Sequence, residues 1–558
     1  MNKSRKAIAT IITLLMCLGI LAACGGDGGG GPAPVAPSVV PQVPASPVAP
    51  DAEGSIAAPA PADPTAVYRD HIDMIIDNNN IAVINPFNPA SQATSTQWVF
   101  TMIHDRLIER NETTGEFVSF LATDWSTDDY QTFIFDLRDD VYFHSGEKFT
   151  AEDVKYTIEY ANEHGIGSPA NAQWRLVETV NVISPTRVEV ILEQVFVDFF
   201  HNISISASSI VSKAAMEADT ETGPYIGSGP YMIDHFEPND YVRMVRNDNY
   251  WNDNLNIVTP TVTFRFVPEM SARTIRMQTG ESQLSHGTSA DDVALFQADP
   301  DNFQVFPHTY ATLQGYSMNM SDPLLSDKNL RFAIMHATDR AEISIMAAGE
   351  WCAPITQDQG GGTVWGYATE FRNNNIPMLE FDQDLAREYL AASSYDGEEI
   401  EIAAAIITNI RAAQALQQQL AAVGINTRIA EFDSPGLSAY MMNPESPTQL
   451  VFISLTMNSG AGSMRNLIYP GAVQNTRMQY NNPEVTEILD RATGELDTNA
   501  RRDLYMRLQE IVAEDPPFLQ TYWRINAVVA AEGIGGVRLN SDNLQTDMRQ
   551  MYQIIGYE

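Results

Sequence analysis

Cysteine and basic residues are scarce in this sequence. Its 558 residues include 3 cysteines, and 33 lysines and arginines stand against 71 aspartates and glutamates, which gives a formal net charge of −38. Cys17, Cys24 and Cys352 provide neither a disulfide framework nor a Cys-x-x-Cys metal site, so stability must come from packing. The acidic balance argues against nucleic acids and anionic membrane surfaces as partners.

Recognisable catalytic motifs are also missing. The 9 histidines are scattered without an HExxH pattern, and the sequence has no GxSxG elbow and no GxxxxGK[ST] loop. His144, in VYFHSGEKF, is the most conspicuous histidine, but a lone histidine at the end of a strand is more often structural. The sequence therefore predicts binding rather than turnover, with no cofactor and no bound metal. A secreted hydrolase that uses two carboxylates is the alternative from another class.

Long apolar runs are limited to one, close to the N-terminus. It covers residues 7–23, which is short for a membrane-spanning helix, and it follows the basic residues Lys3, Arg5 and Lys6. A basic start, an apolar middle and small residues at the exit are typical of an export signal. We therefore expect residues 1–23 to be a signal peptide and the rest of the chain to lie outside the cytoplasm.

The apolar run ends in LAAC, Leu21 to Cys24, which resembles the bacterial lipoprotein signal. The resemblance implies cleavage before Cys24 and a diacylglyceryl group on its sulfur, and two acyl chains suffice for stable anchoring. A stray cysteine in an ordinary signal is the alternative. Residues 24–65 then continue with glycines and with Pro, Ala and Val repeats, which predict a disordered spacer between the anchor and a folded body.

The body has a mixed α/β pattern. Strand-like runs cover residues 179–192, 259–267 and 448–457, and helical periodicity covers residues 151–164, 329–349, 411–424 and 501–515. Thr150 stands at the N-cap of its helix and Gly424 at the C-cap of another. Within the third helical run we expect RFAIMHA to be core, with Asp339 and Arg340 near solvent.

Several ordered blocks resemble the extracellular solute-binding proteins of the oligopeptide, dipeptide and nickel family (family 5), which serve ABC importers. The blocks run in the family's order through nearly the whole mature chain; they are FLATDW (120–125), residues 130–161, GSGPYMIDHFEPNDYVRMVRNDNYW (227–251), residues 316–343, 413–425 and 480–518. In GSGPY we expect Gly227 and Gly229 to adopt backbone conformations closed to other residues and to serve packing or a hinge.

The resemblance implies an α/β, two-lobed fold like that of periplasmic binding proteins (type II, cluster C) with an extra inserted domain. Domain I would comprise residues 66–97, 225–280 and 516–558, domain II residues 98–224, and domain III residues 281–515. The two lobes would be joined by crossing strands and would close on a ligand held between domains I and III. The importer's permease subunits would then recognise the closed form.

The expected ligand-binding residues differ from those of peptide-binding relatives. In those relatives the stretch after the 448–457 strand carries tryptophan and an aspartate that pairs with the peptide's α-ammonium, whereas residues 453–471 here contain no Asp, Glu or Trp. We expect neutral contacts and one guanidinium from this stretch, and further contacts elsewhere. The candidates are Thr456, Asn458, Ser459 and Arg465, together with Asn85, Asn88, Tyr316, Asn319 and Trp365.

The sequence thus predicts a monomeric, extracytoplasmic binding protein held to the membrane only through its lipid anchor. A peptide or peptide-like solute is the leading ligand, and an oligosaccharide, an opine-like solute or a metal complex are alternatives. A sensor that reports its ligand to a membrane receptor would share the same fold.

Overall fold

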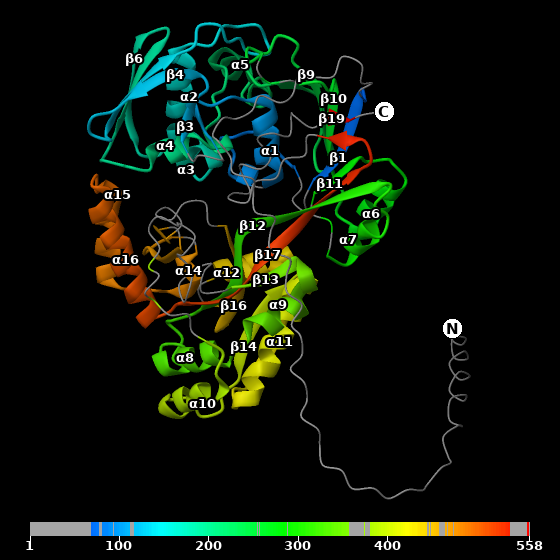
Figure 1. Ribbon diagram of the computed structural model, residues 1–558. Helices are drawn as coiled ribbons and strands as arrows, with labels where there is room; N and C mark the ends of the chain where they lie inside the picture. The colour runs from blue at the N-terminus through cyan, green and yellow to red at the C-terminus, as the bar shows by residue number, and fades with distance from the viewer. Residues whose placement is uncertain are drawn as a thin grey trace, which may run out of the picture. The chain divides into compact units, whose positions relative to one another are not determined.

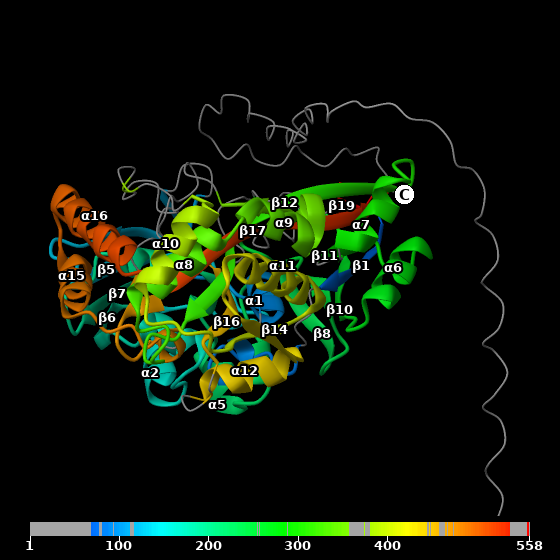
Figure 2. The ribbon, with the colours of Figure 1, turned by 90° about the horizontal axis from the view of Figure 1, so that it is seen from below.

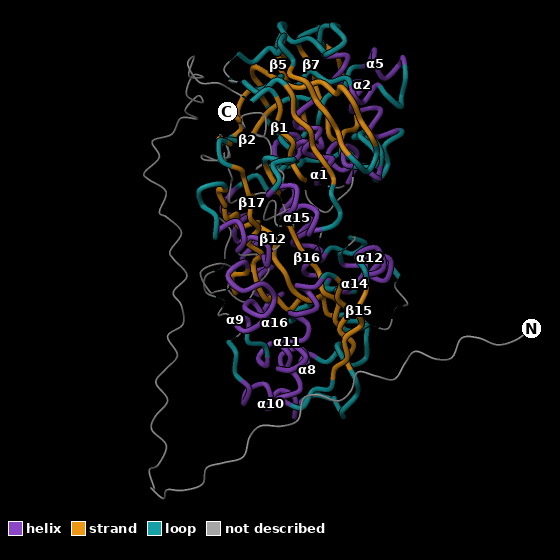
Figure 3. Tube along the Cα trace, turned by 90° about the vertical axis from the view of Figure 1, so that its right-hand side faces the viewer, coloured by secondary structure: helices purple, strands orange, loops and turns teal. Residues whose placement is uncertain are grey.

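An eleven-stranded sheet organises most of the chain, and the strands lie in Figures 1 and 3 among helices from both halves of the sequence. The computed structural model describes residues 69–535, apart from 77–80, 112–115, 356–372, 377–379, 457–463 and shorter gaps, and the pair 555–556. The order along the sheet is β15 (Thr427–Phe432), β14 (Ile400–Ala405), β16 (Leu450–Thr456), β12 (Phe303–Met318), β17 (Phe518–Ala531), β11 (Leu284–His286), β1 (His71–Ile76), β10 (Thr261–Phe266), β9 (Tyr241–Arg246) and β8 (Tyr231–Glu237), with β13 (Cys352–Pro354) also paired to β17.

The strand β1 shows why this sheet is covered on both sides. It pairs in parallel with β10 and β11, and five of its six residues are buried, as expected for a parallel strand between two layers. Ile72 and Met74 pack with helix α1 (Thr94–Ile103) on one face. On the other face Ile75 packs with Met277 of α6 (Met270–Gln278). A third helix, α7 (Ala290–Gln297), contributes Phe296 to that second cluster.

The β14–β16 end of the sheet also has two helical layers. Ile402 and Ala404 of β14 face one layer, and Ala403 and Ala405 face the other, as the two-residue period of a strand requires. The first layer, visible in Figure 2, contains α8 (Lys328–Ala337), α9 (Arg340–Ala348), α10 (Gln383–Ala392) and α11 (Ile407–Val423). The second contains α12 (Ser434–Met442), α14 (Asn475–Met478), α15 (Pro483–Gly494) and α16 (Thr498–Glu514).

A separate four-stranded sheet lies wholly within the segment predicted as an inserted domain. Its hydrophobic cluster includes Phe133, Phe135 and Trp174. The strands are β4 (Ala122–Ser126), β5 (Thr132–Leu137), β7 (Arg187–Leu192) and β6 (Val177–Ser184), accompanied by the hairpin β2 (Ile108–Arg110) and β3 (Phe117–Ser119) and by α2 (Ala151–Glu163), α3 (Pro169–Trp174), α4 (Phe199–Ile203) and α5 (Lys213–Ala218).

Local signals located the helices well where capping residues set their ends. The carboxylate of Asp153 accepts hydrogen bonds from the backbone N–H and the hydroxyl of Thr150, which starts α2. Gly424 ends α11 in the left-handed region, with φ of 98°. The run 329–349 is two helices, because Asp339 caps α9 by accepting from the backbone N–H groups of Ala341 and Glu342.

One expectation about exposure needs correction, and two predicted boundaries can be compared with the strand pairing. Arg340 is buried, and its Nε donates to the carbonyl of Gln520 on β17 at 3.0 Å, so it serves packing rather than solvation. The strand β11 follows residue 280 yet pairs with β1, and residues Trp98–Ile103 of α1 share a core with β1. Strand pairing and packing therefore extend past the boundaries expected near residues 97 and 280.

No helix within the described residues is both long and apolar enough to cross a membrane. Cys24 and the residues predicted to form a signal peptide and a spacer lie outside the described part of the chain.

Candidate functional site

The two longest strands, β12 and β17, pair with each other along two separate stretches. Residues 303–309 pair with 525–531 beside β11, and residues 313–317 pair with 518–523 beside β16, with a register break between Thr309 and Leu313. A second irregularity follows at Gly315, where a Cβ would lie 2.2 Å from the carbonyl oxygen of Leu519. Breaks of this kind bend strands locally, so the break is the structural candidate for a hinge.

Two other strands end toward this break from opposite sides. Ile76 is the last residue of β1. The pairing registers of β1 with β11, β11 with β17 and β17 with β12 place it opposite Phe306 of β12, three strands away across the sheet. The last residue of β16, Thr456, pairs with Thr312. These two levels are six residues apart along β12, roughly 20 Å. Ligands of α/β proteins bind beyond the carboxyl ends of strands, so this region is the candidate ligand site.

The structure does not describe four of the predicted ligand side chains. Trp365, Asn458 and Ser459 lie outside the described residues, and only the backbone of Thr456 is described.

Tyr316 and Asn319 lie on or directly after β12, but both side chains have structural contacts. Tyr316 is fully buried, its ring packs edge-on to Phe452 with centroids 5.3 Å apart, and burial raises the pKa of its hydroxyl well above the usual range. The Asn319 carboxamide oxygen accepts from the backbone N–H and the hydroxyl of Ser321. Tyr316 therefore has no accessible atom in this structure, although its hydroxyl has no hydrogen-bond partner within the described residues, and its predicted contact with a ligand stays a prediction.

Arg465 is engaged by its own chain. Its Nη2 donates to Asp490 at 2.9 Å, and the guanidinium carbon lies 3.7 Å from the centre of the Tyr469 ring. The Tyr469 hydroxyl donates to the same carboxylate at 3.0 Å. Asp490 therefore holds one arm of the guanidinium, whereas Nη1 has no hydrogen-bond partner within the described residues, and the predicted contact of Arg465 with a ligand anion stays a prediction.

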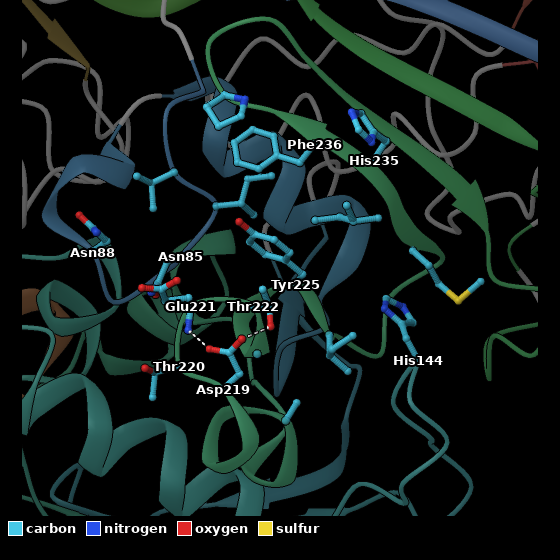
Figure 4. Close-up of a pocket in the computed structure, with 18 of the residues that line it drawn as sticks. Asn85, Asn88, His144, Asp219, Thr220, Glu221, Thr222, Tyr225, His235 and Phe236 are labelled. Atoms are coloured by element: carbon cyan, nitrogen blue, oxygen red, sulfur yellow. Dashed lines mark hydrogen bonds between the residues drawn. The ribbon is translucent and has the colours of Figure 1, made fainter.

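Asn85 and Asn88 are brought together in a cavity of about 930 Å³, drawn in Figure 4. Their carboxamide oxygens accept from the backbone N–H groups of Phe87 and Ala90, each at 2.9 Å, so both residues also shape the turns that carry them. Tyr316, Asn319 and Arg465 do not line this cavity. The structure therefore divides the predicted ligand residues among several places.

The GSGPY block is a close packing junction. A Cβ on Gly227 would lie 1.7 Å from the carbonyl oxygen of Ile103, and one on Gly229 would lie 2.5 Å from the Ile103 carbonyl carbon. Neither glycine has a positive φ, so lack of space, rather than special backbone angles, requires glycine here. His144 secures the block: it accepts from Gly227 N–H and contacts the Gly229 carbonyl at 3.0 Å, which confirms its structural role.

Beside this junction lies a buried carboxylate that the sequence had not marked. Asp105 accepts hydrogen bonds from the Ser228 hydroxyl at 2.9 Å, the Tyr250 hydroxyl at 3.0 Å and the Trp251 indole at 2.8 Å. Burial raises the pKa of Asp105 to about 7 against the lowering effect of these donors. The sequence feature that could have pointed to this buried carboxylate is the polar triplet HDR, residues 104–106, directly after the helix 94–103.

Comparison with known proteins identifies the family to which this chain belongs. The model of the bacterial extracellular solute-binding proteins, family 5 (middle region) matches residues 116–466. This match covers more than half of the chain. The chain belongs to this family.

Individual relatives of this family 5 protein are distant but extensive matches. The glutathione-binding protein GsiB of Escherichia coli (strain K12) is 24% identical over 410 residues, covering 70% of this chain and 78% of GsiB. NikZ from Campylobacter jejuni, crystallised with Ni(L-His), superposes with a TM-score of 0.75 at 18% identity, covering 88% of this chain and 100% of NikZ. A dipeptide-binding protein from Pseudoalteromonas sp. SM9913, crystallised with Met-Leu, gives 0.72 at 22% identity, covering 85% and 98%.

The solved structures show the fold, which is the two-lobed α/β fold of the family 5 binding proteins. Among the described residues of this family 5 protein, no group of three or more His, Cys, Asp or Glu could hold a metal ion.

Proposed function

We propose that this protein captures a peptide or peptide-like solute outside the cytoplasm and delivers it to an ABC importer, without chemical turnover. The observation that carries the proposal is the register break in β12 and β17, with the carboxyl ends of β1 and β16 directed toward it. Closure about this break would bring the segments after those strands onto one solute. The solute would favour the closed form only by binding it better than the open form.

The three-part division remains part of this proposal. Domain I would comprise residues 66–97, 225–280 and 516–558, domain II residues 98–224, and domain III residues 281–515. The pairing of β11 with β1 favours moving the start of domain III beyond residue 286. The core shared by α1 and β1 favours moving the start of domain II beyond Ile103.

The chemistry of the solute is the finer part of the proposal. Glutathione, a dipeptide and a nickel–histidine complex are named for three similar proteins, and each of them contains an amino acid or a peptide. In this chain residues 453–471 lack the acidic side chain that would pair with a free α-ammonium group, and Arg465 is bound to Asp490. These features favour a blocked or modified peptide over a free dipeptide. Opines and oligosaccharides remain alternatives.

A thermal-shift screen of free peptides, N-acetylated peptides, opines and oligosaccharides tests the proposal. A bound solute raises stability by RT ln(1 + [L]/Kd), so the right class raises Tm in a concentration-dependent way. We expect at least one peptide-like compound to do so and to be recovered intact after incubation. Tight binding of free dipeptides that N-acetylation abolishes would contradict the argument from the missing acid, and steady product formation would contradict the absence of turnover.

Membrane anchoring through Cys24 is a separate proposal, supported by the LAAC motif and the spacer that follows it. Changing Cys24 to Ser removes the only sulfur to which the lipid could be attached at the cleavage site. We expect the Cys24→Ser protein to leave the membrane fraction for the periplasm or medium, whereas a Cys17→Ser control stays membrane-bound. Retention of the Cys24→Ser protein in the membrane fraction would refute the anchor.

A further inference from the structure

The cavity that contains Asn85 and Asn88 lies apart from the register break. It follows the free edge of β8, which is the last strand of the eleven-stranded sheet. Four strands separate β8 from β17, which places the cavity roughly 24 Å from β17 across the sheet. Segments around residues 82–88, 215–226 and 232–238 form its walls. Its volume of about 930 Å³ lies within the range of small-molecule sites.

The charges in this cavity have one sign. Its lining includes Asp219, Glu221 and Asp234 and contains neither lysine nor arginine. Asp234 is neutralised by an ion pair with Arg243 on β9, outside the cavity. Asp219 is exposed, and its carboxylate accepts from the Glu221 backbone N–H at 2.9 Å and the Thr222 hydroxyl at 2.7 Å; within the described residues it forms no ion pair with a lysine or arginine. Two carboxylates therefore give this end of the cavity a negative potential.

An aromatic wall stands beside these carboxylates. The rings of Tyr225 and Phe236 meet edge to face, with centroids 6.0 Å apart, and Figure 4 shows both among the lining side chains. Desolvation first, and then the charges of Glu221 and Asp219, raise the pKa of the Tyr225 hydroxyl, so the carboxylates act on this ring. A cation above an aromatic face gains further attraction from the ring.

Two histidines, His144 and His235, also line the cavity, and His144 does not add a positive charge. Burial lowers the pKa of His144 to about 4, and both of its ring nitrogens are taken by Gly227 and Gly229. His144 is therefore neutral at physiological pH and does not repel a cationic ligand. The cavity thus combines ligand-sized volume, an aromatic wall, carboxamides and uncompensated carboxylates.

We propose that this cavity is a second ligand site, distinct from the solute site at the register break, and that it binds small molecules carrying protonated amines. The ammonium group lies against Glu221 and Asp219, and the aliphatic part of the ligand packs on Tyr225 and Phe236. The Asn85 carboxamide provides a further polar contact at the same wall.

Isothermal titration of the Cys24→Ser protein with spermidine, and with uncharged 1,8-octanediol as the matched probe, tests this site. We expect spermidine to bind with one-to-one stoichiometry and octanediol not to bind. Glu221→Gln should weaken spermidine binding about five- to ten-fold, because a charge-assisted hydrogen bond is lost. Tyr225→Leu should weaken it about three-fold through loss of the ring.

A control must distinguish binding of spermidine at this cavity from nonspecific attraction of a polycation to an acidic protein, since the chain carries a formal net charge of −38. Glu217 is an exposed carboxylate on α5, four residues before Glu221, and it does not line the cavity. Glu217→Gln removes the same charge, and we expect it to change spermidine affinity less than about two-fold, because an exposed charge that does not contact the ligand is screened by solvent and salt. Equal weakening by Glu217→Gln and Glu221→Gln, or no weakening by Glu221→Gln, would overturn the proposal. Neither outcome bears on the solute site, which Glu221 does not touch.

Discussion

Individual buried polar residues carry much of the specificity of this fold. Asp105 collects three hydrogen-bond donors from the segment 228–251 and thereby ties the end of α1 to the GSGPY block. His104, its neighbour, is buried and contacts the Pro224 carbonyl at 2.9 Å. Burial lowers the pKa of His104 to about 3, so the two neighbours respond to pH in opposite directions.

The raised pKa of Asp105 predicts a specific pH dependence of stability. In the folded protein Asp105 keeps its proton up to about pH 7, whereas the unfolded chain releases it near its ordinary pKa of 3.8. The folded state therefore binds more protons between about pH 4 and 7, and wild-type stability falls across that window relative to Asp105→Asn. We expect the difference between the two proteins to change by about 2 to 4 kcal/mol.

Urea unfolding of both proteins at pH 4.5 and pH 7.5 measures this difference. The lowered pKa values of His104 and His144 reduce the free energy of unfolding as the pH falls below 6.5. This reduction is the same in both proteins and cancels in the difference. A difference that stays constant between the two pH values would show that Asp105 is ionised throughout and that its burial is better compensated than we infer.

At the scale of the element, the glycines of the GSGPY block set how closely a strand can approach a helix end. Gly227→Ala places a Cβ 1.7 Å from the Ile103 carbonyl oxygen, so the backbone must move. We expect a loss of about 2 kcal/mol or more in the free energy of unfolding, as for overpacked cores. Denaturant unfolding of the purified variant measures this loss.

Gly494→Ala is the matched control for that substitution. Gly494 ends α15, and a Cβ there would have its nearest neighbour at 3.9 Å. Alanine is the better helix residue, so we expect Gly494→Ala to be neutral or stabilising by up to about 1 kcal/mol. If Gly227→Ala were equally well tolerated, the close approach at Ile103 would have no energetic weight.

Helices with local caps could be predicted from the sequence, but long-range strand pairing could not. The ends of α2 and α11 depend on Thr150 and Gly424, which are local signals. The run 179–192 is a hairpin of β6 and β7, although its apolar pattern suggested a strand. The strand β12 left no clear pattern because its two halves pair differently on either side of a break.

At the scale of the whole molecule, the ordered sequence blocks predicted the family and the two-lobed fold correctly. The ligand residues were harder, because their roles depend on partners far away in the sequence. The sequence did not show that Asp490, 25 residues later, pairs with one arm of Arg465, or that the Tyr316 ring packs edge-on against Phe452 in the core. The contact predictions for Trp365, Asn458 and Ser459 remain predictions.

The central claim is that a solute closes the molecule about the break in β12 and β17. Fluorophores on Asp248→Cys, after β9, and Asp384→Cys, on α10, would report this motion, since both side chains are largely exposed. Cys352 will not interfere, because burial raises the pKa of its thiol to about 12 and keeps it unreactive. The Cys24→Ser background removes the other cysteine of the predicted mature chain.

Energy transfer between these two labels, measured while titrating a solute that raises Tm in the thermal-shift screen, is the most direct test. We predict that transfer increases with solute and saturates at one solute per protein, with the solute recovered unchanged. Transfer that stays constant while the solute demonstrably binds would contradict closure about the break in β12 and β17.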